Sequence, residues 1–218
     1  MEHAELTVEA FENGPFMENC YIVAERTSGA ALLVDPGDEE QRLLARVREL
    51  GLTVQGIVNT HAHIDHMGAV APLKRLLGVP FAMHQGDQPV LASAPVVAGF
   101  FGLRAPEVPE VDRWLAHGDT VTVGAIDGQV LHTPGHSPGG CCFYFPRQAV
   151  LITGDTLFAG SIGRTDLPGG DLETLLASLR ERILTLPDEV TVYSGHGPST
   201  TVGRERRANP YLQGDFEG

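Results

Sequence analysis

A short segment in the first third of the chain gathers side chains that bind metal ions. His61, His63 and His66, with Asp65 among them, occupy six consecutive residues soon after the apolar run Val54–Val58. In an extended segment, residues two apart point the same way, so His61 and His63 can converge on one ion. The turn that follows then swings Asp65 and His66 toward another ion. The spacing therefore predicts two metal sites side by side.

Three further residues follow apolar strand-like runs, each with glycine beside it. They are His136 in His-Thr-Pro-Gly-His, Asp155 in Gly-Asp-Thr and His196 in Gly-His-Gly. Glycine permits the close packing that an ion and its ligands require, and the position after a strand lets all three reach one edge of the sheets. Imidazole and carboxylate ligands suit zinc, iron or manganese, and the spacing does not choose among these metals.

The order of these motifs resembles that of a known family. His-x-His-x-Asp-His, His-Thr-Pro-Gly-His, Gly-Asp-Thr and Gly-His-Gly follow one another between residues 61 and 197, as in the metallo-β-lactamase superfamily. Within it, the segment from Gly154 to Asp166 resembles the glyoxalase II (hydroxyacylglutathione hydrolase) group. Full-length glyoxalase II enzymes add a helical C-terminal region with basic residues for the glutathione carboxylates. This sequence ends shortly after Leu212, so the single-domain relatives are the closer comparison.

The resemblance implies a role for each of seven residues. The first ion would be held by His61, His63 and His136, the second by Asp65, His66 and His196, and Asp155 would bridge the two. We expect two divalent ions, zinc first, with iron or manganese as alternatives. A hydroxide between them would attack the substrate carbonyl, with Asp65 and Asp155 as the catalytic carboxylates. The expected reaction is hydrolysis of a thioester such as a hydroxyacylglutathione, whose thiolate leaving group needs little protonation.

Other enzyme classes resemble the chain at the same motifs. Sulfur dioxygenases of this fold share the Gly-Arg-Thr-Asp element and act on glutathione persulfide with one Fe(II), which His61, His136 and Asp155 would bind here. The complete ligand set permits a second ion and favours the hydrolase. A metal-binding module without catalysis would leave the ligands idle. The acidic charge argues against a nuclease, and the lack of a secretion signal argues against β-lactam hydrolysis.

Strand and helix signals place these motifs at the ends of strands. Strands are predicted in two runs over Leu6–Ala24, then at Ala30–Val34, Val54–Val58, Pro80–Met83, Asp119–Val123, Gln129–His132, Cys141–Phe145, Val150–Thr153 and Val190–Tyr193. Three amphipathic helices are predicted, one with its N-cap at Asp38, one through Val70 and Leu77, and one from Asp171 to Pro187. The elements predict an α/β fold, and with the resemblance a four-layer αββα sandwich of two mixed β-sheets flanked by helices.

The segment Gln88–Leu103 is a long central stretch without a charged residue. Two prolines and two glycines interrupt it, and it is too short to span a membrane, so we expect a mobile loop. Phe100 and Phe101 lie near its end. Hydrophobic packing and a flap over the site are equally good interpretations of this segment.

Size and charge limit the partners. A chain of 218 residues with 42% hydrophobic content can bury one substantial core, and we expect a single domain over residues 1–218. The net charge of −13 argues against nucleic acid and against an anionic membrane as partners, so a small-molecule substrate is expected. Both a monomer and a homodimer remain possible.

The N-terminus and the cysteines predict a cytoplasmic protein. Met1–Glu12 lacks the basic and apolar regions of a secretory signal. The chain has three cysteines, Cys20, Cys141 and Cys142, and an odd number does not indicate a disulfide framework. The neighbours Cys141 and Cys142 would point to opposite faces of a strand. We therefore expect core cysteines in a reducing compartment.

Several other polar residues have simpler explanations. His84, His117 and His132 are each expected to be hydrogen-bonded structural residues. Arg164 is expected to form a buried ion pair with a carboxylate such as Asp166, in preference to binding an anionic substrate.

Overall fold

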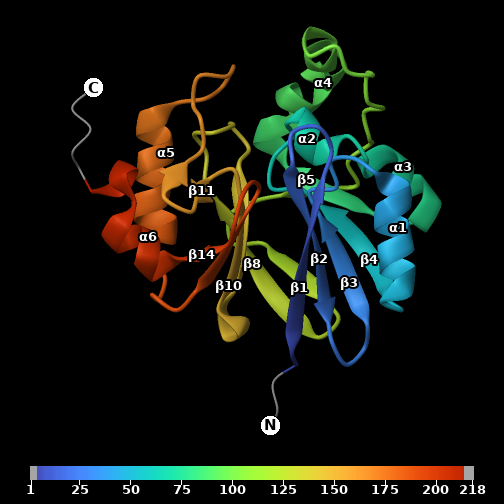
Figure 1. Cartoon of the computed structure of the whole chain (residues 1–218), viewed down its shortest axis with the longest axis horizontal. Coiled ribbons are helices and arrows are strands. Elements are labelled where there is room, and N and C mark those ends of the chain that lie inside the picture. Colours follow the sequence, from blue (N-terminus) through green and yellow to red (C-terminus); the bar gives the residue numbers. More distant parts are fainter. Residues whose placement is uncertain (1–3, 214–218) are drawn as a thin grey trace.

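Two six-stranded β-sheets face each other at the centre of the protein (Figure 1). The computed structural model describes residues 4–213. In the first sheet, β1, β2 and β3 pair antiparallel, whereas β3 to β6 run parallel. Its strands, in spatial order, are β1 (Leu6–Asn13), β2 (Glu18–Glu25), β3 (Ala30–Val34), β4 (Thr53–Val58), β5 (Phe81–His84) and β6 (Arg113–Leu115).

The second sheet is also mixed. Its antiparallel strands β7 to β10 continue into β13, which pairs parallel with β10. In spatial order it contains β14 (Thr200–Thr201), β13 (Thr191–Ser194), β10 (Val150–Gly154), β9 (Cys141–Phe145), β8 (Ile126–His132) and β7 (Thr120–Val123). A separate small hairpin joins β11 (Leu157–Phe158) to β12 (Ser161–Ile162).

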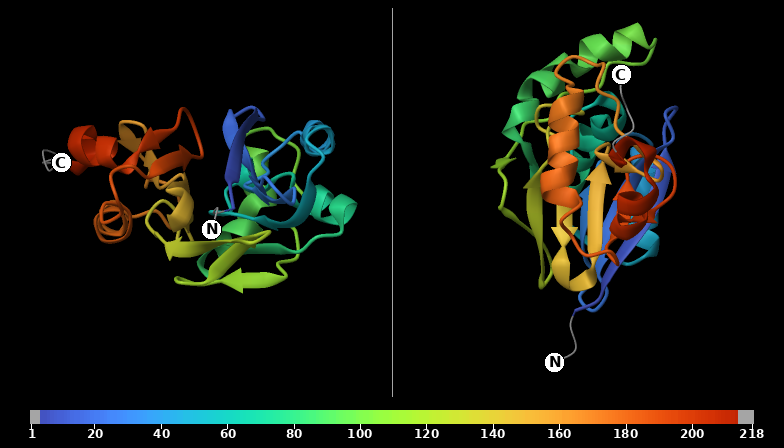
Figure 2. Two further views of the ribbon diagram at one scale, coloured as in Figure 1. Left: turned by 90° about the horizontal axis from the view of Figure 1, so that it is seen from below. Right: turned by 90° about the vertical axis from the view of Figure 1, so that its left-hand side faces the viewer.

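Helices cover the outer face of each sheet. Seen end-on, the two sheets lie inside and the helices outside (Figure 2). On the first sheet lie α1 (Glu40–Glu49), α2 (Ile64–Met67), α3 (Val70–Leu77) and α4 (Gln88–Phe100), and beside the second lie α5 (Leu172–Ser178), a π-helical continuation over Leu179–Ile183, and α6 (Val202–Ala208). Short 3₁₀ turns occur at Gln85–Asp87, Pro146–Gln148 and Pro210–Leu212. The predicted four-layer αββα sandwich is confirmed.

Alternation along the strands divides the apolar side chains among three cores. Tyr21 and Val23 face the space between the sheets, whereas Ile22 packs under the helices of the first sheet. Cys141 lies in the inter-sheet core, and its neighbour Cys142 lies in the core beneath α5 and α6. Cys20, Cys141 and Cys142 are free and buried, so the prediction of core cysteines on opposite strand faces is confirmed.

The prediction of a mobile loop at residues 88–103 is wrong, because most of it forms α4. Pro89 lies in the first helical turn, where a missing N–H is tolerated. Leu91, Ala94 and Ala98 recur at helical spacing and are buried. Leu91 and Ala94 belong to the core between the first sheet and its helices. Burial of this stripe therefore stabilises a helix even though Pro95 lies inside it.

One smaller prediction needs correction, and one short strand was not predicted. The first helix begins at Glu40 with Glu39 as its N-cap residue in the left-handed region, so Asp38 is not the N-cap. The three-residue strand β6 is too short to be recognised from sequence. No helix within residues 4–213 is long and apolar enough to cross a membrane.

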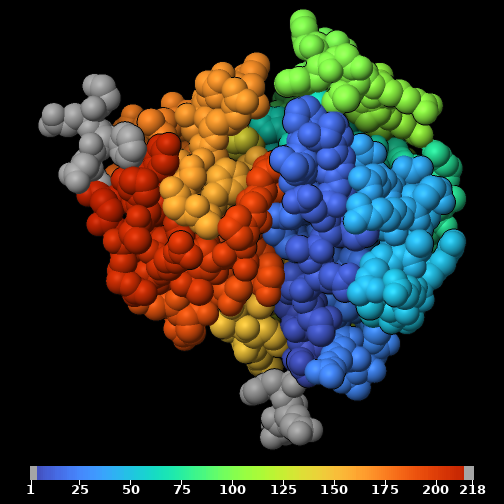
Figure 3. Space-filling model, in the orientation of Figure 1, coloured from blue at the N-terminus to red at the C-terminus, as the bar shows by residue number. Residues whose placement is uncertain are grey.

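The two halves of the chain contribute side by side to one face of the molecule. Segments of the N-terminal half, blue to cyan, meet orange and red segments of the C-terminal half along a boundary, and the green segment containing α4 rises at the top (Figure 3).

Candidate metal centre

The loops that follow four strands deliver the seven predicted residues to one edge of the two sheets. Residues 61–66 follow β4, and His136 follows β8. Asp155 and His196 come directly after β10 and shortly after β13, two parallel neighbours whose carboxyl ends meet at one edge. The structure brings all seven side chains together, and we call this group the candidate metal centre.

Three imidazoles form the first cluster. Nδ1 of His63 lies 2.9 Å from Nε2 of His136, which lies 3.2 Å from Nε2 of His61. One ligand atom from each of these residues lies within 4.8 Å of the other two. The predicted convergence of His61 and His63 on one point is thus observed, with His136 as the third side chain.

The second cluster contains a carboxylate and two imidazoles. Oδ2 of Asp65 lies 3.3 Å from Nε2 of His196 and 3.8 Å from Nε2 of His66. Asp65 and His66 belong to the short helix α2, which turns them away from His63. The helix therefore accounts for the second group of ligands within one short motif.

Asp155 lies between the two clusters. Its Oδ1 is 3.4 Å from Nε2 of His66, and its Oδ2 is 3.6 Å from Nε2 of His196 and 3.7 Å from Nε2 of His136. One carboxylate thus contacts ring nitrogens of both groups. This is the geometry that a bridging ligand requires.

The donor atoms fit divalent cations. Nε2 of His66 and Oδ1 of Asp155 are buried, and neither has a hydrogen-bond partner within the described part of the chain. A buried polar atom without a partner is costly, and a cation between these atoms would remove that cost. Nitrogen and carboxylate oxygen donors suit zinc or iron. The clusters can therefore bind divalent metal.

Three of these side chains are in the protonation states that suit metal binding, whereas in His66 and His196 burial alone would lower the pKa but Asp155 and Asp65 raise it. Burial lowers the pKa of His61 well below its usual value and lowers the pKa of His63 to about 4, so both are neutral at pH 7. Burial alone would raise the pKa of Asp65, but His66 and a hydrogen bond with His196 hold it below its usual range. Neutral imidazole and ionised carboxylate are the forms that bind metal ions.

Asp35 was not predicted, although it orients a member of the centre. Its carboxylate accepts hydrogen bonds from the backbone N–H and the hydroxyl of Thr60, at 2.6 Å and 2.5 Å, and lies 3.1 Å from Nδ1 of His66. Buried Glu18 lies 3.6 Å from the same nitrogen. The available signal was the position of Asp35 at the end of β3, next to β4 in a parallel pair.

Asp87 ties two loops of the centre together. Its buried carboxylate accepts hydrogen bonds from the backbone N–H of Ala62, the hydroxyl of Ser137 and the backbone N–H of Gly139. It thus fixes the loop that carries His61 relative to the loop that carries His136. Its sequence position alone gave no sign of this role, because its partners lie 25 to 52 residues away.

The other three histidines within residues 4–213 lie outside the centre. The rings of His84 and His132 stack with centroids 3.9 Å apart, and Nε2 of His132 lies 3.0 Å from the carbonyl oxygen of Pro138. The backbone N–H of His132 donates to Nδ1 of His117. All three therefore have structural partners, as predicted.

Arg164 pairs with Asp166 at 2.7 Å, but the pair is exposed, so the prediction of a buried ion pair is wrong. The two side chains lie two residues apart in the segment after β12 and are 61% and 66% exposed. Arg164 also lines the cavity beside the candidate metal centre.

A cavity of about 790 Å³ opens above the candidate metal centre. The helix α4 forms one wall, and the segment from Phe158 to Gly169 lies opposite. One side of α4 therefore packs on the core, as the hydrophobic-packing interpretation of residues 88–103 expects, and another side lines the cavity. Residues lining it include His63, Asp65, Pro89, Val90, Val97, Phe101, His136, Asp155, Phe158 and His196.

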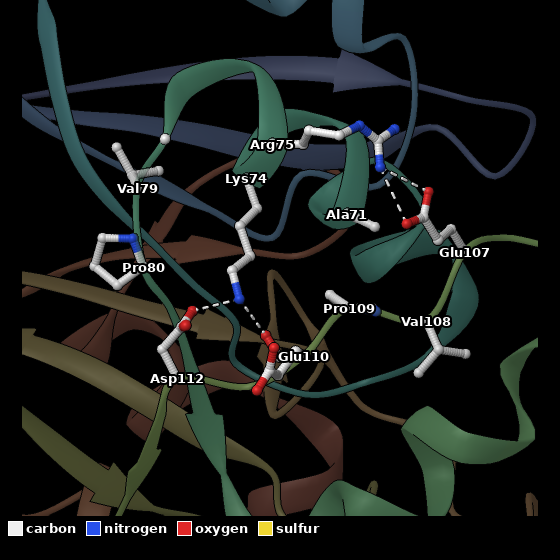
Figure 4. A pocket seen from close by; sticks show the side chains of 11 residues that line it. Ala71, Lys74, Arg75, Val79, Pro80, Glu107, Val108, Pro109, Glu110 and Asp112 are labelled. Atoms are coloured by element: carbon white, nitrogen blue, oxygen red, sulfur yellow. Dashed lines mark hydrogen bonds and ion pairs between the residues drawn. The ribbon is translucent and has the colours of Figure 1, made fainter.

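A second pocket, of about 480 Å³, lies beside α3 and contains no member of the candidate metal centre. Lys74 pairs with Asp112 at 2.6 Å and donates to the backbone oxygen of Glu110, and Arg75 pairs with Glu107 at 3.0 Å (Figure 4). Both of its cations thus have carboxylate partners.

Known proteins resemble this chain in sequence over nearly its whole length. The hydroxyacylglutathione hydrolase GloC of Haemophilus influenzae is 38% identical over 95% of this chain and 98% of its own length.

Three solved structures share its fold and more than a quarter of its residues. The B3 metallo-beta-lactamase BLEG-1 is 37% identical, with a TM-score of 0.90 over 95% of this chain and all of its own. TTHA1623 in a di-iron-bound form is 46% identical, with a TM-score of 0.86 over 94% of this chain and all of its own. ETHE1 from Myxococcus xanthus is 28% identical, with a TM-score of 0.79 over 94% of this chain and 83% of its own.

The family model of the metallo-beta-lactamase superfamily matches residues 13–196, a range that contains every residue of the candidate metal centre. The ordered motifs, the two mixed sheets and the match to this model agree. The chain belongs to the metallo-beta-lactamase superfamily.

Proposed function

We propose that this protein is a hydrolase with a two-metal centre. His61, His63 and His136 would hold the first ion, Asp65, His66 and His196 would hold the second, and Asp155 would bridge them. The observation that carries the proposal is the Asp155 carboxylate, within 3.7 Å of ring nitrogens from both clusters. A centre for one ion would not need a carboxylate in contact with both clusters.

The reaction proposed is attack on a carbonyl carbon. Two divalent ions bound there would supply hydroxide at neutral pH and stabilise the developing oxyanion. The protein's part is to orient the ligands: the backbone oxygen of Arg164 lies 2.8 Å from Nδ1 of His136, and Asp35 holds His66 from behind. With Asp65 and Asp155 committed to metal, a leaving group that needs little protonation is favoured. A thiolate meets that requirement.

The substrate proposed is therefore a thioester, and a hydroxyacylglutathione is the first candidate. The similarity to GloC from H. influenzae supports it. The net charge of −13 supports a small molecule over nucleic acid or an anionic membrane. The free, buried cysteines suit a reducing compartment, so we place the enzyme in the cytoplasm.

A mononuclear iron dioxygenase acting on glutathione persulfide is the second candidate. The similarity to ETHE1 and the Gly-Arg-Thr-Asp element at residues 163–166 support it. His61, His136 and Asp155 would hold its Fe(II), and these three side chains are neighbours in the structure. In that case Asp65, His66 and His196 would be idle, although buried His66 has an unpartnered ring nitrogen.

The two candidates predict different products. Protein purified without added metal would be analysed for bound metal and assayed for thiol release from S-lactoylglutathione and for oxygen uptake with glutathione persulfide. Thiol release with about two ions per chain is the expected result. Oxygen uptake with one iron per chain and no thioester cleavage would overturn the hydrolase in favour of the dioxygenase.

A further inference from the structure

One wall of the cavity above the candidate metal centre carries no charge. The helix α4 and the residues after it, from Gln88 to Leu103, contain no charged side chain. Val90, Val97 and Phe101 from this segment line the cavity. A charge-free helix wall beside a metal centre offers a substrate apolar contact and no ion pair.

The surrounding walls are apolar as well. Phe158, Ile162 and Leu167 line the side opposite α4, and they come from the β11–β12 hairpin and the loop after it. At the mouth, Phe16 packs edge-to-face on Phe101, with ring centroids 5.4 Å apart. Apolar side chains from three segments distant in sequence thus face the same space.

Cations for an anionic substrate are scarce in this cavity. Arg164 is the one lysine or arginine among the described residues that line it, and its guanidinium is already paired with Asp166. Its side chain is 61% exposed, so it lies at the rim. The carboxylates of a charged thiol carrier would therefore bind at or beyond the rim, and the α4 wall is left to the acyl group.

The cavity is also large for a small acyl group. Its volume of about 790 Å³ lies in the upper part of the usual range for sites that hold drug-sized ligands, roughly 300–1,000 Å³. The acyl and thiol parts of a thioester share this volume, and an apolar acyl group longer than lactoyl would displace more water from the apolar wall.

From these observations we propose that the substrate's acyl group is a medium-length aliphatic chain that binds along α4, with its carbonyl at the candidate metal centre. This inference rests on the proposed thioester hydrolase. It goes further in assigning selectivity to the acyl group, whichever thiol carries that group. Val97 and Phe101 are the residues that determine the selectivity.

The first test compares acyl chains on one uncharged thiol. N-acetylcysteamine thioesters with acetyl, butanoyl and hexanoyl groups would be hydrolysed by the metal-loaded protein, with thiol release as the readout. The value of kcat/KM is expected to rise at least about tenfold from acetyl to hexanoyl, because each added methylene buries apolar surface. Equal values, or a fall with chain length, would overturn the inference while leaving the hydrolase intact.

Matched variants on one helix test the location. Val97→Ser is expected to lower kcat/KM for the hexanoyl substrate about three- to tenfold and to leave the acetyl substrate within twofold. Val96→Ser makes the same change one residue away, on a side chain that is 64% exposed and lies outside the cavity lining, and should change neither value. Equal effects of the two variants, or an equal loss for both substrates, would refute the placement.

A second matched pair lies at the cavity mouth. Phe101→Ala should weaken hexanoyl selectivity, whereas Phe100→Ala should not, because Phe100 is 85% exposed and lies outside the lining. Light scattering of the same variants measures their oligomeric state and so tests whether a second copy of the chain covers this wall instead of a substrate. A dimer that only Phe101→Ala dissociates would assign this wall to a second copy of the chain and overturn the proposal.

Binding of amide analogues separates this inference from the proposed function. N-hexanoyl and N-acetyl amides of the same length as the substrates are not cleaved, and their affinity can be measured by calorimetry. We expect hexanoyl to bind at least about tenfold more tightly than acetyl, with the difference reduced in Val97→Ser. Binding that strengthens with acyl length, without thioester cleavage, would contradict only the proposed hydrolase. Binding that does not depend on acyl length would contradict the proposal that the acyl group binds along α4.

Discussion

The candidate metal centre and the pocket beside α3 both gather charged side chains, but their polar atoms are satisfied differently. In the pocket beside α3, Lys74 and Arg75 each contact a carboxylate at the surface. At the candidate metal centre, Nε2 of His66 and Oδ1 of Asp155 are buried and have no hydrogen-bond partner among the described residues. In the first region each cation has a carboxylate partner, whereas in the second these two buried atoms lie 3.4 Å apart and make no hydrogen bond, which a bound cation would change.

This difference separates structural charges from functional ones. Exposed ion pairs contribute about 0–1 kcal/mol, so the pocket beside α3 can lose a charge with little consequence. A buried polar atom without a partner costs about 1–3 kcal/mol, and such atoms persist where a ligand satisfies them. Substitutions in the two regions should therefore have very different effects.

Removal of the bridging carboxylate should have the largest effect. Asp155→Ala deprives both clusters of their shared ligand, so bound metal should fall from about two ions per chain and turnover should fall at least about 10³-fold. Metal analysis and the thioester assay measure both changes. The matched change in the other region, Asp112→Ala, should alter neither, and full activity in Asp155→Ala would contradict every catalytic account of this centre.

Substitution of a residue that orients a ligand should have an intermediate effect. Asp35→Asn keeps the side-chain shape but weakens the contact with Nδ1 of His66, and loss of such a partner costs about 10–100-fold in metal affinity or activity. Competition with a fluorescent chelator measures the affinity. Equal metal affinity in Asp35→Asn and Asp112→Asn would contradict the role of Asp35 in orienting His66.

The smallest effect is expected beside α3. A hydrogen bond from Lys74 lowers the pKa of Asp112, so the charged pair adds to stability above the carboxyl's usual pKa of about 4 and is lost as the pH falls below it. Asp112→Asn should lower the free energy of unfolding by no more than about 1 kcal/mol at pH 7. Urea titrations at pH 7 and pH 3 should show a smaller difference at the lower pH, because the contribution decreases as the pH falls from the usual pKa toward the lowered one, and a difference that grows there would contradict this assignment.

The seven side chains of the candidate metal centre could be predicted from sequence because each lies in a short motif directly after a strand. Asp35 and Asp87 were missed because their hydrogen-bond partners come from other loops. Asp35 has only the weak signal of its position after β3, and nothing local marks Asp87. The fold was predictable where apolar residues alternate or recur at helical spacing. The prediction was wrong at α4 because its two prolines suggested a loop. In the structure, burial of Leu91 and Ala94 stabilises a helix there.

The most direct test of the two-metal account is the position of the ions. Crystals of protein purified without added metal would be measured at X-ray wavelengths on either side of the iron and zinc absorption edges. The account predicts two anomalous peaks per chain, one among His61, His63 and His136 and one among Asp65, His66 and His196. A single iron peak beside His61, His136 and Asp155, with no second ion, would contradict it.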